Sequence, residues 1–248
     1  MNIQFGSGVL YGNPVAGNQP ANPTPFKFGV LQEVIVDFKG DLKKLFGQYQ
    51  LAVATARGKI ETTIKGKLAV FDVNMLNQLY FGQPAANVTQ GYNLIVDGEA
   101  HNNTTAVVTN TPIVADWGVV DAVTGADYLN QPNLAAVVTT GEYSVNLTSG
   151  TYTFNSNVSV KISYSYFNNT NTGTTVVLAN QLMGYAPELK MLLYNKFRNK
   201  YLAVQLNDVT LGSISIPTKL EDFWISDFDG SANADATNTL GQLMMDNF

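Results

Sequence analysis

Hydrophobic and polar side chains alternate in two segments of the first third of the chain. Val34, Val36 and Phe38 occupy every second position of residues 34–39, and charged or polar residues alternate with Ile and Thr in residues 59–65. Successive side chains of a strand point to opposite faces. A period of two therefore predicts two strands, each with one face on a core and the other in water.

The segment between these two strands is apolar without a strand-like period. It is rich in Leu, Phe, Tyr, Val and Ala over Leu45–Ala56, and we expect it to form a long loop. Loops run over the surface, where a monomer gains nothing by exposing large apolar side chains. We therefore expect a neighbouring chain to cover this loop; the alternative is that the loop folds back on the core of its own subunit.

A short helix is expected after the second strand. Asp72 stands where a helix needs an N-cap, and Gly82 stands where it needs a C-terminal stop. Between them Val73, Leu76 and Leu79 share one face of a helix. These signals predict one helix that flanks the strands.

The remaining chain contains strand patterns separated by turn residues. Residues 1–25 are rich in Gly, Pro and Asn, which predicts a flexible N-terminal arm. Residues 26–248 are expected to form a single β domain, with 83–150 as an inserted or decorated β region. The expected strands downstream are Tyr92–Val96, Thr105–Thr109, Ile113–Val120, Leu134–Thr140, Thr151–Phe154, Val158–Phe167, Leu189–Tyr194, Tyr201–Leu206, Asn207–Ser215 and Phe223–Phe228.

Composition favours a β-rich protein that buries surface against other subunits. Charged residues make up only 13% of the 248 residues, about half the usual globular share. The chain has no cysteine, which excludes disulfides and thiolate metal sites. Its net charge is −5, which argues against a surface that grips nucleic acid.

The charge is distributed unevenly along the chain. No Lys or Arg occurs from Leu68 through Val160, although seven acidic residues lie there. This is either a weakly charged insert that happens to be acidic, or an acidic surface that faces a basic patch of another subunit or a channel that repels DNA. The N-terminus has no signal-peptide pattern, and no apolar run approaches ~18 residues. We therefore expect synthesis and use in a cytoplasm-like compartment, without a membrane.

No pattern of catalytic, cofactor-binding or metal-binding residues is evident. His101, the only histidine, lies in a polar stretch that predicts an exposed loop. Asp227–Gly230 resembles part of a calcium loop, but Ile225 and Ala236 stand where an EF-hand needs oxygen ligands. We therefore expect no enzyme, no cofactor and no catalytic residue, and leave open another kind of ion site near Asp227–Asp235.

Two blocks of motifs occur in a characteristic order. The first is the strand–loop–strand–helix block with Leu45, Phe46-Gly47, Ala56-Arg57-Gly58-Lys59 and Tyr80-Phe81-Gly82. The second combines Pro187, the strand Leu189–Tyr194, Ile216-Pro217 and Lys219–Phe223, followed by acidic and small residues at Asp227–Asp235. In this order the two blocks resemble the tail tube (major tail) proteins of long-tailed bacteriophages, over about half of the chain.

The resemblance implies a mainly β subunit, built as a β-sandwich or half-barrel with one short flanking helix. Six subunits would close into a ring whose inner strands complete one ring-wide barrel, and stacked rings would form a tube through which DNA leaves the virion. Ring closure also removes exposed sheet edges, which otherwise pair without control. The region 83–150 departs from the simplest form of this pattern.

The expected function is therefore that of a self-assembling tail tube subunit, assembled in the host cytoplasm and located in the virion tail. Its implied partners are further copies of itself, the tail terminator, tape measure and distal tail proteins, and passing DNA that is not bound specifically. The alternative is a virion surface protein or a receptor- or carbohydrate-binding β protein. The expected inter-ring contacts are Leu45, Phe46, Tyr49, Leu51 and Arg57, and the residues expected to face the lumen are Glu33, Asp37, Lys39, Lys59, Glu61 and Lys65.

Overall fold

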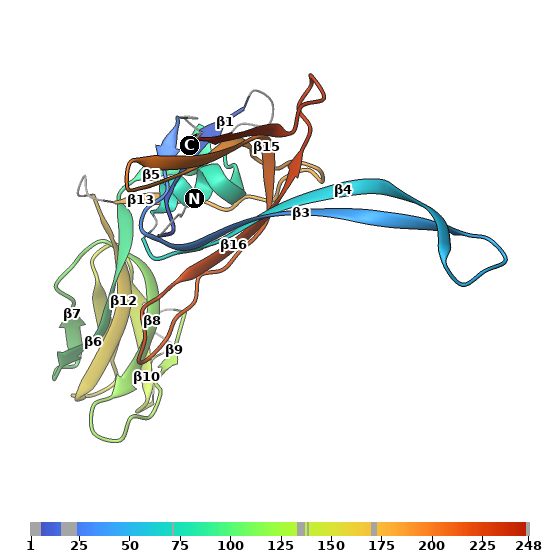
Figure 1. The fold of residues 1–248 in the computed structure, drawn as a ribbon. Helices are drawn as coiled ribbons and strands as arrows, with labels where there is room; N and C mark the ends of the chain where they lie inside the picture. The colour runs from blue at the N-terminus through green and yellow to red at the C-terminus, as the bar shows by residue number, and fades with distance from the viewer. Residues whose placement is uncertain are drawn as a thin grey trace. The chain divides into compact units, whose positions relative to one another are not determined.

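The computed structural model describes residues 6–15, 24–70, 72–132, 137, 139–169 and 173–246 (Figure 1). It is mainly β, with several antiparallel sheets and one short α-helix among these residues, as predicted. The chain divides into two compact units, which are described one at a time. Unit 1 comprises residues 1–89 and 176–248, and unit 2 comprises residues 90–175.

Unit 1 is built on one eight-stranded sheet. Its strands follow the order β2-β1-β14-β15-β16-β4-β3, and β17 pairs with β15 beside this path. Every neighbouring pair is antiparallel. The strands are β1 (Val9–Pro14), β2 (Phe26–Lys27), β3 (Leu31–Phe46), β4 (Ala52–Leu68), β14 (Glu188–Phe197), β15 (Lys200–Ile214), β16 (Ser226–Asn233) and β17 (Gly241–Met245).

The N-terminal and C-terminal thirds contain more strand than the sequence pattern suggests. Within the expected arm, residues 9–14 form β1 and pair with β14, whereas residues 1–5 and 16–23 lie outside the described part. The two strands expected over 201–215 are one strand, β15, with a register shift between Leu211 and Ser213. Most of the strand expected at 134–140 also lies outside the described residues.

The core of unit 1 lies on one face of the sheet and under the helix. The predicted helix is confirmed: α1 (Val73–Leu76) continues as a π-helical turn, η1 (Asn77–Phe81). Asp72 accepts a hydrogen bond from the backbone amide of Met75 at 2.7 Å, and Gly82 ends the helix at a φ of 59°. The core residues are Leu10, Phe28, Leu31, Ile64, Leu68, Met75, Leu79, Leu189, Met191, Leu206, Val209, Leu211, Phe228 and Ala232.

The segment between β3 and β4 differs from the expected long loop. Both strands continue into it, so that only residues 47–51 connect them. Backbone pairing runs out to Leu45 opposite Ala54 and Phe46 opposite Ala52, with register shifts after Gly40 and Leu45. The shifts break the period of two that the sequence pattern relies on, while Val and Thr on β4 still favour a strand. The result is a long two-stranded hairpin (Figure 1).

Unit 2 consists of two sheets that enclose one core. One sheet contains β7 (Thr105–Val107), β11 (Thr151–Phe154), β10 (Glu142–Asn146) and β9 (Leu129–Asn130), and the other contains β6 (Tyr92–His101), β12 (Val160–Asn168) and β8 (Ile113–Asp121). The expected region 83–150 overlaps most of this unit. A 3₁₀ turn, η2 (Ala85–Asn87), and the pair β5 (Val88–Gln90) and β13 (Thr174–Val176) lie where the chain passes between the units. The core residues are Ala106, Val108, Ile113, Val119, Tyr143, Tyr152, Phe154, Val160, Ile162 and Tyr164.

Two isoleucines on the same strand provide a test of this fold. Ile64 is completely buried under the sheet, whereas Ile60, on the free part of β4, is 55% exposed. We predict that Ile64→Ala lowers the free energy of unfolding by about 2–5 kcal/mol, because it leaves a cavity. Ile60→Ala should change it by less than about 0.5 kcal/mol, because the side chain is already in water. Denaturant unfolding of the dilute, unassembled protein measures both, and equal effects would contradict the described hairpin.

Candidate assembly surface

The six residues expected to face a lumen lie together on one face of the sheet. The register of β3 and β4 places Glu33 opposite Lys67, Ile35 opposite Lys65, and Lys39 opposite Glu61. Side chains directly opposite each other share a face, and every second residue along a strand returns to it. The structure therefore brings together on this face Glu33, Asp37, Lys39, Lys59, Glu61 and Lys65.

This polar face continues across the neighbouring strands. Asp227 and Asp229 of β16 lie opposite Lys67 and Lys65, and the hydroxyl of Ser213 donates a hydrogen bond to Asp229. Together with Glu33 and Ile35 of β3, they line an open hollow of about 570 Å³. The face is therefore wet and carries both signs of charge side by side.

Charges on this face neutralise one another locally. Lys59 and Glu61 form an ion pair of 2.8 Å, and Lys67 and Glu33 form one of 3.4 Å, all with exposed side chains. The hydrogen bond between the first two lowers the pKa of Glu61 and raises the pKa of Lys59. Exposed pairs of this kind contribute little to stability, but they leave a surface with little net attraction for a polyanion.

The expected inter-ring residues lie at the tip of the hairpin and in water. Tyr49 is 77% exposed and Leu51 is 82% exposed, and Leu45 and Phe46 are also exposed. None of them folds back onto the subunit core. Arg57 stands opposite Leu42, and its aliphatic stem packs over Gly40.

A second apolar stripe lies on the hairpin, and its exposure was not predicted from the sequence pattern. Phe38, Leu42 and Ile60 are more than half exposed. They lie on the face of the ribbon that continues the core face, because Val34 and Val36 are in phase with them. At its base, Phe38 lines an apolar groove of about 260 Å³ together with Val204, Leu206, Leu240 and Leu243. The alternation that begins at Val34 could have revealed this stripe. It continues to Phe38, beyond Val34 and Val36, which pack against the core.

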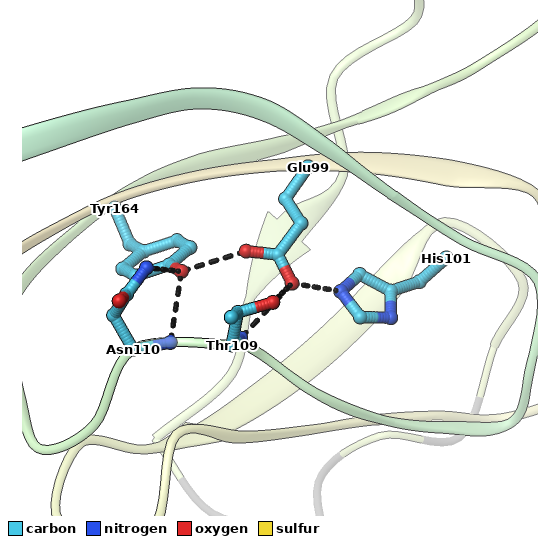
Figure 2. Close-up of polar contacts among 5 residues, drawn as sticks. All are labelled: Glu99, His101, Thr109, Asn110 and Tyr164. Atoms are coloured by element: carbon cyan, nitrogen blue, oxygen red, sulfur yellow. Dashed lines mark hydrogen bonds and ion pairs between the residues drawn. The ribbon is translucent and has the colours of Figure 1, made fainter.

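Unit 2 contains a partly buried carboxylate held by four donor groups (Figure 2). Glu99 accepts hydrogen bonds from the hydroxyl of Tyr164 at 2.6 Å and from the amide and hydroxyl of Thr109 at 3.0 and 2.9 Å. The Nε2 atom of His101 lies 3.0 Å from the same carboxylate. Asn110 donates to the Tyr164 hydroxyl from its backbone and side chain. The cluster ties the segment after β7 to β6 and β12.

The prediction of His101 as an exposed loop residue is wrong. His101 is the last residue of β6, and its side chain is only 16% exposed. The residues that follow His101 in sequence are polar and therefore predicted a loop. The strand forms because β6 pairs with β12, which is distant in sequence. Burial acts to raise the pKa of Glu99, but the hydrogen bonds from Tyr164 and Thr109 and from His101 outweigh it and lower the pKa overall. These hydrogen bonds satisfy both oxygens of the partly buried carboxylate.

A second carboxylate of unit 2, Asp116, is also held by several hydrogen-bond donors. Asp116 accepts hydrogen bonds from Tyr143 at 2.6 Å and Tyr152 at 3.0 Å, and from the side chain of Asn130 at 3.0 Å. Burial and the nearby Asp116 carboxylate raise the pKa values of both tyrosines. Both therefore remain neutral donors to a partly buried acid.

Charge differs sharply between the two units. Unit 1 contains 13 acidic and 13 basic residues and is formally neutral, whereas unit 2 contains 6 acidic residues and a single basic one, Lys161. Unit 2 therefore carries the whole formal net charge of −5. The residues that carry this net charge lie in a different segment of the chain from the polar face of unit 1.

Neither a metal-binding cluster nor a membrane-spanning helix is found in the part of the chain that the structure describes. No three His, Cys, Asp or Glu side chains gather there closely enough to hold an ion, including Asp227 and Asp229. No helix there is long and apolar enough to cross a bilayer. No known protein family matches the chain, and no curated protein sequence matches it significantly.

The Glu99 cluster generates a pH-dependent prediction. Glu99→Gln should lower the free energy of unfolding at pH 7 by about 1–3 kcal/mol, because charge-assisted hydrogen bonds are lost. Since the folded protein holds the Glu99 pKa below its ordinary value of 4.5, the contribution is present above that value and disappears as the pH falls through the folded-state pKa. Chemical unfolding of both proteins between pH 7 and pH 3 measures this, with Tyr164→Phe as a control that removes one donor. A difference that stays constant down to pH 3 would contradict the assignment.

Proposed function

We propose that this protein is the structural subunit of a bacteriophage tail tube, which assembles into stacked homohexameric rings around a channel for DNA. The observation that carries the proposal is the β3–β4 hairpin. Residues 39–61 pair only with each other within the described chain, and the ribbon exposes apolar side chains on one face and at its tip. A lone two-stranded ribbon is marginally stable in water, so this one is suited to packing against another subunit.

The edges of the sheet support ring formation. β3 is the last strand of the unit 1 sheet, and its outer edge has no partner within the described residues. An unpaired edge is a template for pairing with another chain, and closure into a barrel removes it. In the proposed ring, each subunit is a half-barrel whose inner strands continue into those of its neighbours. Subunits joined by a heterologous interface of this kind form a closed ring when the rotation from one subunit to the next divides a full turn evenly.

The polar face supplies a suitable channel wall. DNA that must leave quickly needs a wetted wall that does not hold its phosphates, because each phosphate neutralised by Lys or Arg adds affinity. Here Lys59 and Lys67 are each paired with a glutamate, and Asp229 stands opposite Lys65 on the neighbouring strand. The proposed lumen therefore passes DNA without binding it specifically.

The remaining parts of the proposal follow from a tail tube. Its partners are other copies of this chain and the tail terminator, tape measure and distal tail proteins. Its location is the virion tail after assembly in the host cytoplasm. One observation favours the alternative of a receptor- or carbohydrate-binding β protein: unit 2 is compact by itself and exposes Trp117 on β8. An exposed Trp is suited to stacking on a sugar or anchoring a partner.

Microscopy of the purified protein and of one double variant tests the assembly. We expect six-fold rings and tubes from the unaltered chain, and folded subunits that form no tubes from Phe46→Asp with Tyr49→Asp. Both side chains are more than half exposed, so the change should leave the unassembled fold intact, while burial of each side chain in the tube is worth ~1.5–3 kcal/mol.

Circular dichroism melting separates loss of assembly from loss of fold. An unchanged melt with no tubes supports the proposal, and a double variant that still forms long tubes would refute it. Monodisperse monomers or trimers of the unaltered chain at high concentration would instead favour the binding protein.

A further inference from the structure

Stacked rings need two different contact surfaces at opposite ends of each subunit. A head-to-tail interface is heterologous, so the patch that a subunit offers to the next ring differs from the patch that it receives from the previous one. The hairpin tip, with Phe46, Tyr49 and Leu51, is one exposed apolar patch. Unit 1 contains a second exposed apolar patch at the other end of its sheet.

The loop between β15 and β16, residues 215–225, lies at the opposite end of the sheet from the tip. β4 runs from Ala52 beside the tip to Leu68 at its base, and Leu68 lies opposite Ser226, where the loop ends. The 17 residues of β4 span about 55 Å at the usual rise of a strand. The tip and the loop are therefore at the two ends of one long strand.

The loop exposes large apolar side chains and is anchored at its base. Leu220 is 98% exposed and Phe223 is 81% exposed, and Ile216 and Trp224 are more than half exposed. At its base, Ser215 and Asp227 exchange hydrogen bonds of 2.9 and 3.0 Å. An apolar cluster of this kind on a soluble subunit indicates an interaction site.

The charges of the tip and the loop are complementary. Lys43, Lys44 and Arg57 lie on the two strands just below the tip, and none of them forms an ion pair among the described residues. The loop carries Glu221 and Asp222 against a single cation, Lys219, which is already 3.2 Å from Asp222. Opposite charges on two apolar patches favour contact between them over contact between like patches.

We propose that the β15–β16 loop receives the hairpin tip of the next copy along the tube. This joint rests on the proposed function, which requires that copies stack. The apolar side chains around Phe46 and Tyr49 pack against Leu220 and Phe223, and the basic residues that flank the tip face Glu221. The loop is then the acceptor for the tip of one ring and sets the direction in which rings add.

Chemical cross-linking tests the joint, since the natural chain has no cysteine. The variant Tyr49→Cys with Leu220→Cys, treated with a flexible bis-maleimide after assembly, should give a ladder of linked chains. Each single variant should give none. Dimers from Tyr49→Cys alone would show that tips meet tips, and would overturn the proposal, as would tubes of the double variant that give no ladder.

A pair of substitutions adds a functional readout. Leu220→Asp with Phe223→Asp should leave rings and melting temperature unchanged and reduce the stacked fraction at least about tenfold, a factor that corresponds to ~1.4 kcal/mol. Val123→Asp, at an 86% exposed position of unit 2, is the matched control and should stack normally. Normal stacking of the loop variant would contradict the joint. If the unaltered chain forms no rings at all, the proposed function fails instead.

Discussion

The central physical feature of unit 1 is the outer part of the β3–β4 hairpin, which pairs only with itself and exposes apolar side chains. The inner part of the hairpin is held in the sheet by β16 and by the core around Ile64, whereas its outer part has only its own partner strand. A ribbon of this length with exposed Phe38, Leu42 and Phe46 is costly in water, because neither face is buried. The subunit therefore contains an anchored part and an extension that the described residues of the same subunit leave uncovered.

The charged side chains of the two units have different environments. In unit 2, Glu99 and Asp116 are each satisfied by several donors from distant strands, which fixes the packing of the two sheets. In unit 1, charges remain on the open face of the sheet and pair weakly in water. The first arrangement specifies a self-sufficient sandwich, and the second keeps a wide surface hydrated. This division fits an assembly in which unit 1 forms the tube and unit 2 is an added module.

Local patterns predicted local structure well, and failed where a distant strand decided the outcome. The alternating pattern located β3 and β4 and placed the six polar residues on one face. Asp72 and Gly82 marked the two ends of the helix. The length of the hairpin was missed because register shifts at Gly40 and Leu45 hide its period. The position of His101 was missed because only its pairing partner Val160, 59 positions later in the chain, reveals the strand. The strand expected over Phe223–Phe228 begins only at Ser226, so that residues 215–225 form a loop. Only the pairing of Ser226 with Leu68 places this loop at the opposite end of the sheet from the tip.

Hydrogen exchange of backbone amides in the hairpin tests the central claim most directly, because it compares the same residues before and after assembly. In the dilute subunit, amides of residues 42–56 should exchange rapidly, since local stability there is low. In the concentrated, assembled protein these amides should slow markedly, while amides beside the buried Ile64 should be protected in both states. Equal and rapid exchange of residues 42–56 in both states, with assemblies present, would show that the hairpin is not the interface and would contradict the proposed tube.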